Sequence, residues 1–287
     1  MRKILLTGSS GQLGQSILKV SANHNFEIIA TDLESLDITD PNAIEEIFSA
    51  EKPDIVINAA AYTDVDKATE EHETANLVNG KAPGLLAQAS KKHNALFIHI
   101  STDYIFDGEK NTPYSESDVA DPANAYGKSK LLGEQAVARS GAAALIIRTA
   151  WLYPEYGHNF VKTMIKLAKQ GKALRVINDQ HGSPTYAGDL AEAILFLAGN
   201  RFPSGVTIFH VTNSGTTTWH GLAEKTFEYA DIKADLSAVS TQEYGSATAR
   251  PMNSVLSNER LQILTGYSMP HWEEGLMRCI KALENKD

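Results

Sequence analysis

The chain has 287 residues, of which 43% are hydrophobic and 21% charged, as in an ordinary globular protein. Its 26 Lys and Arg against 35 Asp and Glu give a net charge of −9, which argues against a basic surface for nucleic acid. The sequence contains no run of about 18 apolar residues, so it predicts no membrane span. The single cysteine, Cys279, cannot form an internal disulfide, which favours a reducing, cytoplasmic location.

Short β-branched runs alternate with helical segments through the first half of the chain. The predicted strands are residues 4–7, 27–31, 54–58, 96–101 and 144–149, and the predicted helices are 12–20, 41–50, 82–93 and 126–139. This alternation predicts a parallel sheet with helices on both faces. We therefore expect an α/β fold of the Rossmann type, a doubly wound parallel sheet, with residues 1–153 as its dinucleotide-binding domain.

The second half is looser, because long loops rich in Gly, Ser, Thr and Pro separate its predicted helices. Those helices are residues 160–169, 189–198, 219–230 and 272–283. We expect residues 154–287 to form mainly a smaller α/β lobe that lies over the carboxyl ends of the sheet and binds substrate. Segments around residues 174–212 are expected to return to the first domain.

A glycine-rich turn follows the first predicted strand. Gly8, Gly11 and Gly14 allow a tight turn, close approach of the backbone to a pyrophosphate, and close packing of the next helix. The pyrophosphate would lie at the helix N-terminus, where the helix dipole favours an anion. Asp32 ends the second strand at about the 20-residue spacing expected for a ribose-binding carboxylate. The turn predicts a nicotinamide dinucleotide site; a βα turn without a ligand is the alternative.

Tyr126 and Lys130 are four residues apart, so they share one face of the predicted helix 126–139. Such a pair arises easily by chance, and its meaning depends on what surrounds it. Here the preceding strand ends in Ser101, Thr102 and Asp103.

The glycine turn, Thr102 and the Tyr126–Lys130 pair together resemble the extended short-chain dehydrogenases/reductases. Longer strings are similar to those of the dTDP-4-dehydrorhamnose reductases, at residues 56–69, 101–108, 126–134, 148–153, 176–185 and 250–254. The resemblance implies hydride transfer from NAD(P)H to the 4-keto group of dTDP-4-dehydro-β-L-rhamnose, giving dTDP-β-L-rhamnose. That reaction is the last step of dTDP-L-rhamnose biosynthesis, which supplies cell-surface polysaccharide.

The resemblance also implies roles for individual residues. Tyr126 would donate the proton, Lys130 would lower the pKa of Tyr126, and Thr102 would polarise the carbonyl group. The cofactor would contact Gly8, Gly11, Gln12, Leu13, Gly14, Asp32, Asp37, Ile38, Ala60, Ala61, Tyr62 and Thr63, together with Tyr126 and Lys130.

The substrate would contact Thr102, Asp103, Tyr104 and Trp151, with Arg250 near the nucleotide diphosphate. Structural alternatives remain for three of these residues. Thr102 could cap a strand, Trp151 could pack between the lobes, and Arg250 could be a solvated surface residue.

The sequence leaves the choice of dinucleotide and the metal open. Asp32 favours the 2′-hydroxyl of NADH over the 2′-phosphate of NADPH, whereas the resemblance implies NADPH, so we expect both to work. Some relatives bind Mg²⁺ at a dimer contact through glutamates. Here Gln15 and Ser16, and Gly188 and Asp189, occupy those places, so the Mg²⁺ ligands are not evident. A homodimer is left open.

Two other functions share much of this pattern. One is a nucleotide-sugar epimerase or dehydratase, which usually has a longer chain and retains its cofactor tightly. The other is a non-catalytic regulatory subunit resembling that of methionine adenosyltransferase, which the intact set of Thr102, Tyr126 and Lys130 disfavours. The sequence also leaves open whether the nucleotide is thymidine or uridine, and which polysaccharide receives the rhamnose.

Overall fold

The computed structural model describes residues 1–202, 204–245 and 248–285. Its central sheet has six parallel strands in the order β10-β5-β4-β3-β1-β2. The strands are β1 (Arg2–Thr7), β2 (Phe26–Thr31), β3 (Ile55–Asn58), β4 (Leu96–Thr102), β5 (Ala144–Thr149) and β10 (Val206–His210). The chain runs outward from β1 to β2 and then crosses back to β3. Ligands of doubly wound sheets bind outside the carboxyl ends of the strands at this switch point.

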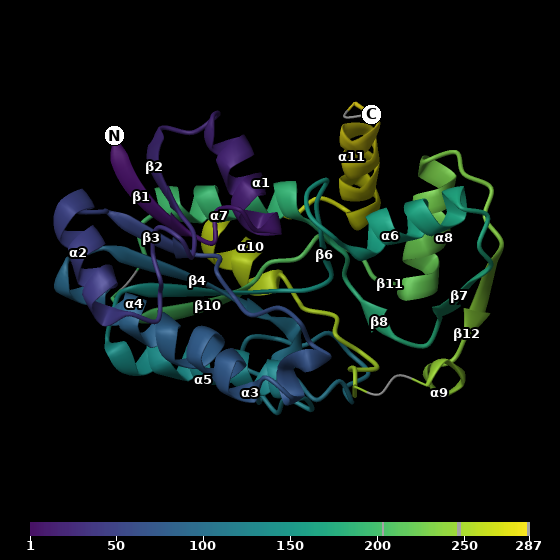
Figure 1. The fold of residues 1–287 in the computed structure, drawn as a ribbon, viewed down its shortest axis with the longest axis horizontal. Coiled ribbons are helices and arrows are strands. Elements are labelled where there is room, and N and C mark those ends of the chain that lie inside the picture. Colours follow the sequence, from purple (N-terminus) through teal and green to yellow (C-terminus); the bar gives the residue numbers. More distant parts are fainter. Residues whose placement is uncertain (203, 246–247, 286–287) are drawn as a thin grey trace.

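Helices cover both faces of the sheet, which confirms the predicted doubly wound α/β fold (Figure 1). One face carries α1 (Gln12–Ser21), α7 (Ala187–Gly199) and α10 (Glu259–Thr265); the other carries α2 (Pro41–Glu51), α4 (Ala82–Lys92) and α5 (Ala125–Ser140). Side chains alternate between faces along a strand, so Ile4 and Leu6 pack in the first layer and Leu5 in the second. All three are fully buried, as strands covered on both faces require.

Polar caps set where the helices begin. Asp40 accepts a hydrogen bond from the backbone N–H of Asn42 (2.8 Å) at the start of α2, with a proline in the first turn. Asn124 does the same for the N–H of Gly127 (2.8 Å) at the start of α5. The cap on α5 fixes the first turn of the helix that carries Tyr126 and Lys130.

The second lobe lies on the right of Figure 1 and has its own apolar core between helices. The helices are α6 (Phe160–Lys169), α8 (Trp219–Tyr229) and α11 (Trp272–Glu284), with the short α9 (Thr241–Tyr244) nearby. Three two-stranded sheets join its loops: β6 (Leu152–Tyr153) with β9 (Thr185–Tyr186), β7 (Leu174–Ile177) with β12 (Leu236–Val239), and β8 (His181–Gly182) with β11 (Thr217–Thr218).

The segment 174–212 is divided between the lobes. Strands β7, β8 and β9 pair within the second lobe, whereas α7 packs on α1 and β10 extends the main sheet beside β5. The domain boundary between residues 153 and 154 stays a prediction.

The connection between β3 and α4 contains three short helical segments. It forms η1 (Lys67–Thr69), α3 (His72–Ala75) and a π-helical turn, η2 (Asn76–Lys81). The side chain of Asn79 in that turn accepts from the backbone N–H of Tyr62 (2.9 Å) and donates to its carbonyl oxygen (2.9 Å). This pairing holds the loop after β3 at the edge of the sheet.

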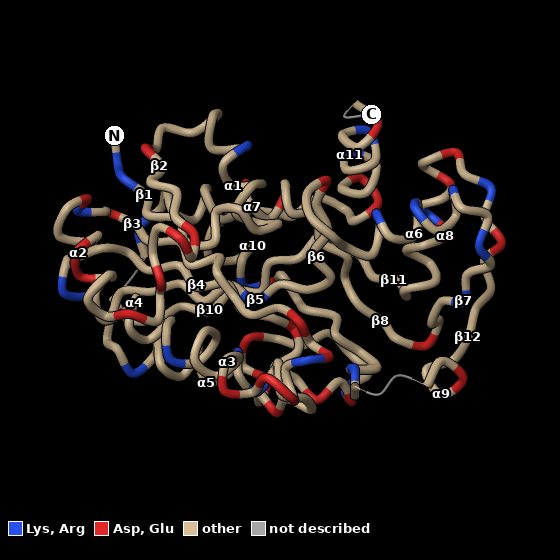
Figure 2. Tube along the Cα trace, viewed as in Figure 1, with Lys and Arg blue, Asp and Glu red and all other residues tan. Residues whose placement is uncertain are grey.

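Charges of both signs are interspersed along both lobes (Figure 2). None of the helices in the described ranges has the length and apolar character that crossing a bilayer would need.

Candidate active site

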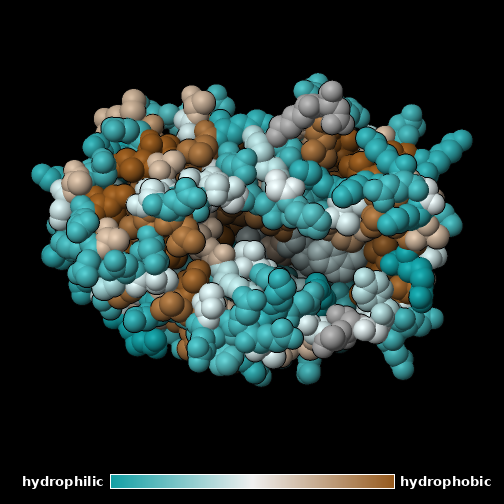
Figure 3. All heavy atoms as spheres, viewed as in Figure 1, coloured by the Kyte–Doolittle hydropathy of each residue, from teal (hydrophilic) through white to brown (hydrophobic). Residues whose placement is uncertain are grey.

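The main cleft opens over the carboxyl ends of the strands, where the surface is hollowed between the lobes (Figure 3). Its volume is about 810 Å³. The ends of β1 to β5 form its floor, and Trp151, Leu152 and Gly157 contribute from the side of the second lobe. Every predicted cofactor and substrate residue lines it except Gly14 and Arg250. Residues predicted from separate motifs thus meet in one place.

The glycine turn lies so close to neighbouring backbone that it has no room for side chains. Gly8 has a φ of +67°, and a Cβ there would lie 2.6 Å from the backbone nitrogen of Ala60. A Cβ on Gly14 would lie 2.2 Å from the carbonyl oxygen of Gly8, so this glycine serves the packing of α1 on the turn. Gly11 caps α1 without any side-chain hydrogen bond, which leaves the first N–H groups available to an anion. The turn therefore fits a dinucleotide pyrophosphate.

Asp32 lies across the turn from Ser10. Its Oδ2 accepts the backbone N–H of Ser10 (2.8 Å) and the Ser10 hydroxyl, and its Oδ1 accepts the N–H of Leu33 (2.9 Å). The hydrogen bond from the Ser10 hydroxyl lowers the pKa of Asp32, so the carboxylate is ionised at neutral pH. Asp37, at the same end of the cleft, also has a lowered pKa because Thr39 donates to it.

Among the described residues that line the cleft, Lys130 is the only Lys or Arg. The end predicted to hold the adenosine ribose thus presents two carboxylates and no lysine or arginine for a 2′-phosphate.

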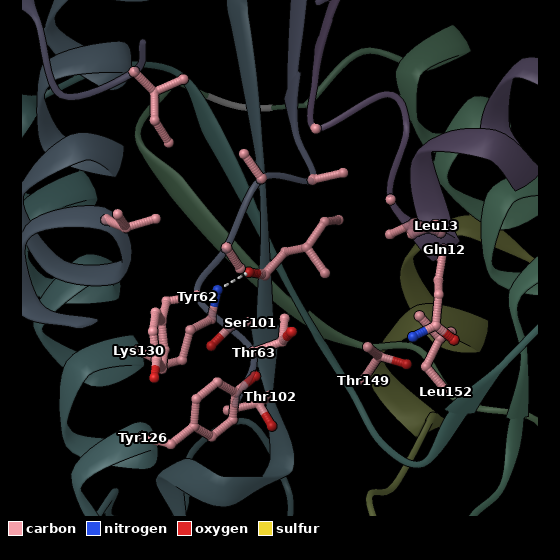
Figure 4. Close-up of a pocket in the computed structure, with 18 of the residues that line it drawn as sticks. Gln12, Leu13, Tyr62, Thr63, Ser101, Thr102, Tyr126, Lys130, Thr149 and Leu152 are labelled. Atoms are coloured by element: carbon pink, nitrogen blue, oxygen red, sulfur yellow. Dashed lines mark hydrogen bonds between the residues drawn. The ribbon is translucent and has the colours of Figure 1, made fainter. Parts of the chain in front are cut away.

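Tyr126 lies in the first turn of α5, and its ring points toward Thr102 at the end of β4 (Figure 4). The ring of Tyr104 packs edge-on against it, with centroids 5.7 Å apart. Burial raises the pKa of Tyr126, the charge of Asp103 adds to this, and a hydrogen bond with Thr102 opposes it. The phenol is therefore protonated at neutral pH, which is the form that can donate a proton.

Lys130 extends from the next turn of α5, and its Nζ donates to the carbonyl oxygen of Ile100 (2.6 Å), drawn as a dashed line in Figure 4. Burial lowers the pKa of Lys130 to about 8. Because its nearest partner in the structure is Ile100, the predicted effect of Lys130 on the pKa of Tyr126 stays a prediction.

Several polar atoms at the cleft are buried without a hydrogen-bond partner among the described residues. They are Oδ2 of Asp103, Oγ1 of Thr149 and Oε1 of Gln12. Burial raises the pKa of Asp103 to about 6, while the hydroxyls of Ser254 and Thr102 oppose the rise. Buried polar atoms are normally paired, so these three fit a site completed by a polar ligand.

Thr149 also lines the cleft and was not among the predicted site residues. Thr149 ends β5 directly opposite Thr102 on β4, so its position at a strand end beside a predicted catalytic residue was a usable signal.

Trp151 forms a wall of the cleft and also contributes to packing. It has a φ of +47°, stacks on Trp219 with ring centroids 3.6 Å apart, and donates from Nε1 to the Ser254 hydroxyl (3.1 Å). A Cβ on Gly182 would lie 2.3 Å from the indole, so a glycine is needed there.

Arg250 lies outside the cleft lining, and its guanidinium donates to both carboxylate oxygens of Asp66 (3.1 Å each). Its predicted contact with the nucleotide diphosphate stays a prediction.

The places that hold metal ligands in some relatives are engaged otherwise. Gln15 donates to the carbonyl oxygen of Ser10 (2.6 Å). Asp189 accepts from Arg278 (2.7 and 2.6 Å) and from Asn213 (2.7 Å). Within the described ranges, no group of three or more His, Cys, Asp or Glu side chains is placed to bind a metal ion. These residues do not fit a Mg²⁺ site, because an arginine already neutralises the one carboxylate among them.

The chain is similar over nearly its full length to a family model, to named proteins and to solved structures. Residues 1–285 match the family described as RmlD substrate binding domain. The chain is 41% identical to the spore coat polysaccharide biosynthesis protein SpsK of Bacillus subtilis (strain 168), over 98% of each sequence. It is 40% identical to the dTDP-4-dehydrorhamnose reductase of Escherichia coli (strain K12), over 98% of this chain and 97% of that one.

The structure is similar to that of dTDP-4-dehydrorhamnose reductase from Bacillus anthracis str. Ames in complex with NADP. The TM-score is 0.94 at 38% sequence identity, covering 98% of this chain and all of the other.

Proposed function

The chain belongs to the RmlD substrate binding domain family, and from this premise we propose that it reduces dTDP-4-dehydro-β-L-rhamnose to dTDP-β-L-rhamnose with NADPH. The observation that carries the proposal is the meeting of Thr102, Tyr126 and Lys130 in the cleft that the glycine turn enters. Full-length relatives named as dTDP-4-dehydrorhamnose reductases, one of them solved with NADP, support it.

NADPH, when bound, supplies the hydride. Tyr126 would hold a proton on its phenol oxygen and pass it to the oxygen on sugar C4 as negative charge develops there. The Thr102 hydroxyl, beside the phenol, would donate a hydrogen bond to the same oxygen. The Lys130 ammonium would hold the cofactor ribose and stabilise the phenolate that remains. Asp103 and Trp151 would contact the sugar.

The nucleoside of the substrate, the oligomeric state and the cellular location are further points. We propose thymidine as the nucleoside because the reductases that the chain resembles carry that name. A homodimer and a cytoplasmic location stay predictions from the sequence.

The test is NADPH consumption by the purified protein with dTDP and UDP forms of the keto sugar side by side. We expect turnover with the dTDP form and at most slow turnover with the UDP form. If neither keto sugar is reduced and a nicotinamide cofactor co-purifies that dialysis does not remove, an epimerase or dehydratase would be the better assignment. No turnover, together with stable binding to a methionine adenosyltransferase, would favour the regulatory subunit.

Replacing Asp32 with asparagine should shift the binding preference toward NADPH. A carboxylate and a phosphate about 5 Å apart repel by roughly 1–3 kcal/mol at effective dielectric constants between 80 and 20. Asp32 is partly exposed, so the low end of this range applies, and we expect the ratio of the NADPH Kd to the NADH Kd to fall by about fivefold. Fluorescence titration at low salt measures both Kd values.

Glu34→Gln is the matched control, because Glu34 is an exposed carboxylate two residues further on that does not line the cleft. An unchanged ratio in Asp32→Asn would show that Asp32 does not face the 2′ position.

The pH dependence of kcat should show an alkaline limb near 8. Burial lowers the pKa of Lys130, so as pH rises through about 8 the side chain loses the positive charge that stabilises the phenolate. An unperturbed lysine would lose that charge only near pH 10.4. Steady-state kcat at saturating substrate, from pH 6 to 10, measures the limb. A flat profile up to about pH 10 would contradict the role given to Lys130.

A further inference from the structure

A buried ion pair joins β5 to the face of α5 that carries Tyr126 and Lys130. Glu134 and Arg148 are each 4% exposed and Lys130 is 3% exposed, so three charged side chains share this interior. Glu134 and Arg148 do not line the cleft. Removing two charges from water can cost more free energy than their attraction returns, so a buried ion pair is not explained by stability alone.

The carboxylate of Glu134 is bound from two strands at once. Its Oε1 accepts the Ser101 hydroxyl (2.5 Å) from β4 and Nε of Arg148 (2.9 Å) from β5, and its Oε2 accepts a second Arg148 nitrogen (2.7 Å). Ser101 and Arg148 are direct partners in the register of the two strands. The third guanidinium nitrogen of Arg148 lies 3.4 Å from Nε2 of His210 on β10. His210 is the register partner of Arg148 on that side.

Ser101, Arg148 and His210 form a row across three strands. The spacing of residues on α5 connects this row to the predicted catalytic residues. Tyr126, Lys130 and Glu134 are four residues apart and lie on one face of the helix. Each meets the end of β4: Tyr126 beside Thr102, Lys130 on the carbonyl of Ile100, and Glu134 on Ser101. Three successive helical turns are thus fixed against the last three residues of one strand.

The polar and titratable groups around Lys130 come from several elements. On its own helix they are Tyr126, which is a neutral phenol, and Glu134. From β4, His99 faces it, and burial holds the pKa of that imidazole well below its usual value, so it is uncharged. From β5, the charge of Arg148 is matched by Glu134. The π-helical turn η2 contributes Asn79, which does not titrate and is hydrogen-bonded to Ser129 (3.0 Å).

We propose that Glu134 is a positioning residue for the reductase reaction. It holds the end of β4 against α5, and its carboxylate, one helical turn from Lys130, stabilises the ammonium form of that buried side chain while it is also paired with Arg148. The proposal rests on the proposed function only in giving Lys130 a catalytic role. The coupling between Glu134 and Lys130 is a property of the protein itself and can be measured without substrate.

The test is Glu134→Gln, which keeps the shape of the side chain and removes its charge. With ¹³Cε-labelled lysine and the Lys130 resonance assigned by its loss in Lys130→Met, we expect the NMR titration midpoint of Lys130 to fall by about one pH unit. The alkaline limb of kcat should move with it, so that turnover falls about fivefold at pH 8 and changes little at pH 6.

Two further variants separate positioning from folding. Glu134→Gln together with Arg148→Met leaves no unpaired charge, so it should fold if the single variant does not, and its Lys130 midpoint should also lie below that of the wild type. Asp189→Asn removes another buried carboxylate paired with an arginine, in α7, and should lower thermal stability without moving the midpoint.

An unchanged Lys130 midpoint in the Glu134 variants, with lowered stability alone, would overturn the proposal and leave Glu134 a purely structural role. If the midpoint shifts but the wild type reduces no keto sugar, the proposed function fails while the Glu134–Lys130 coupling stands.

Discussion

Replacing Tyr126 with phenylalanine is expected to lower kcat by about 10²–10⁴-fold, the usual contribution of a positioned general acid. The variant loses only the phenol oxygen. Its ring can still pack against Tyr104, as the wild-type ring does at a centroid distance of 5.7 Å, so the site should keep its shape. NADPH should therefore bind with a Kd close to that of the wild type, and the loss should appear in kcat rather than in cofactor affinity.

Tyr153→Phe is the matched control for this variant. Tyr153 is 1% exposed, donates from its hydroxyl to the carbonyl of Trp272 (3.2 Å), and lies outside the cleft lining. Removing its hydroxyl should cost some stability and leave kcat within a few-fold of the wild type. Turnover of Tyr126→Phe within about tenfold of the wild type would show that another group donates the proton.

Replacing Gly8 with alanine is expected to weaken NADPH binding by about a hundredfold, equivalent to roughly 3 kcal/mol. The new methyl group would lie 2.6 Å from the backbone nitrogen of Ala60 and 2.7 Å from its Cα, which no side-chain movement can relieve. The turn must then move away from the end of β3, and the N–H groups that would face the pyrophosphate move with it. Isothermal titration with NADPH measures the change.

Gly171→Ala separates this effect from backbone strain. Gly171 follows α6 and has a φ of +69°, nearly that of Gly8, but nothing lies within 4 Å of the added Cβ. Both variants carry the cost of about 1–2 kcal/mol for a left-handed alanine, measured by thermal unfolding. Only Gly8→Ala should lose the cofactor, and equal Kd values in the two variants would contradict the placement of the cofactor at the turn.

Local signals in the sequence account for much of the fold. The glycine turn and the Asp40–Pro41 helix start depend on residues that are neighbours in the chain, and both occur where the sequence predicts them. The Tyr126–Lys130 pair could be predicted for the same reason, because residues four apart on a helix lie on the same face. The contiguous strands of the first half followed from nearly unbroken apolar runs.

Features set by distant parts of the chain could not be predicted in this way. The row of Ser101, Arg148 and His210 depends on the register of β4, β5 and β10. Strand β10 joins the sheet only after the chain has passed through segments of the second lobe. The π-helical turn η2 has no simple periodic signature. The pairing of Arg250 with Asp66 joins a loop of the second half to the loop after β3. Each of these needs the assembled fold.

The most direct test of the central claim follows the hydride itself. The purified protein would be given dTDP-4-dehydro-β-L-rhamnose and NADPH that carries deuterium at the transferable position of the nicotinamide C4. We predict that the product is dTDP-β-L-rhamnose with a single deuterium on sugar C4, seen by mass spectrometry and NMR. A product without deuterium at that carbon, or no reduction of the keto sugar in the presence of bound NADPH, would contradict the assignment of this cleft as a 4-keto sugar reductase site.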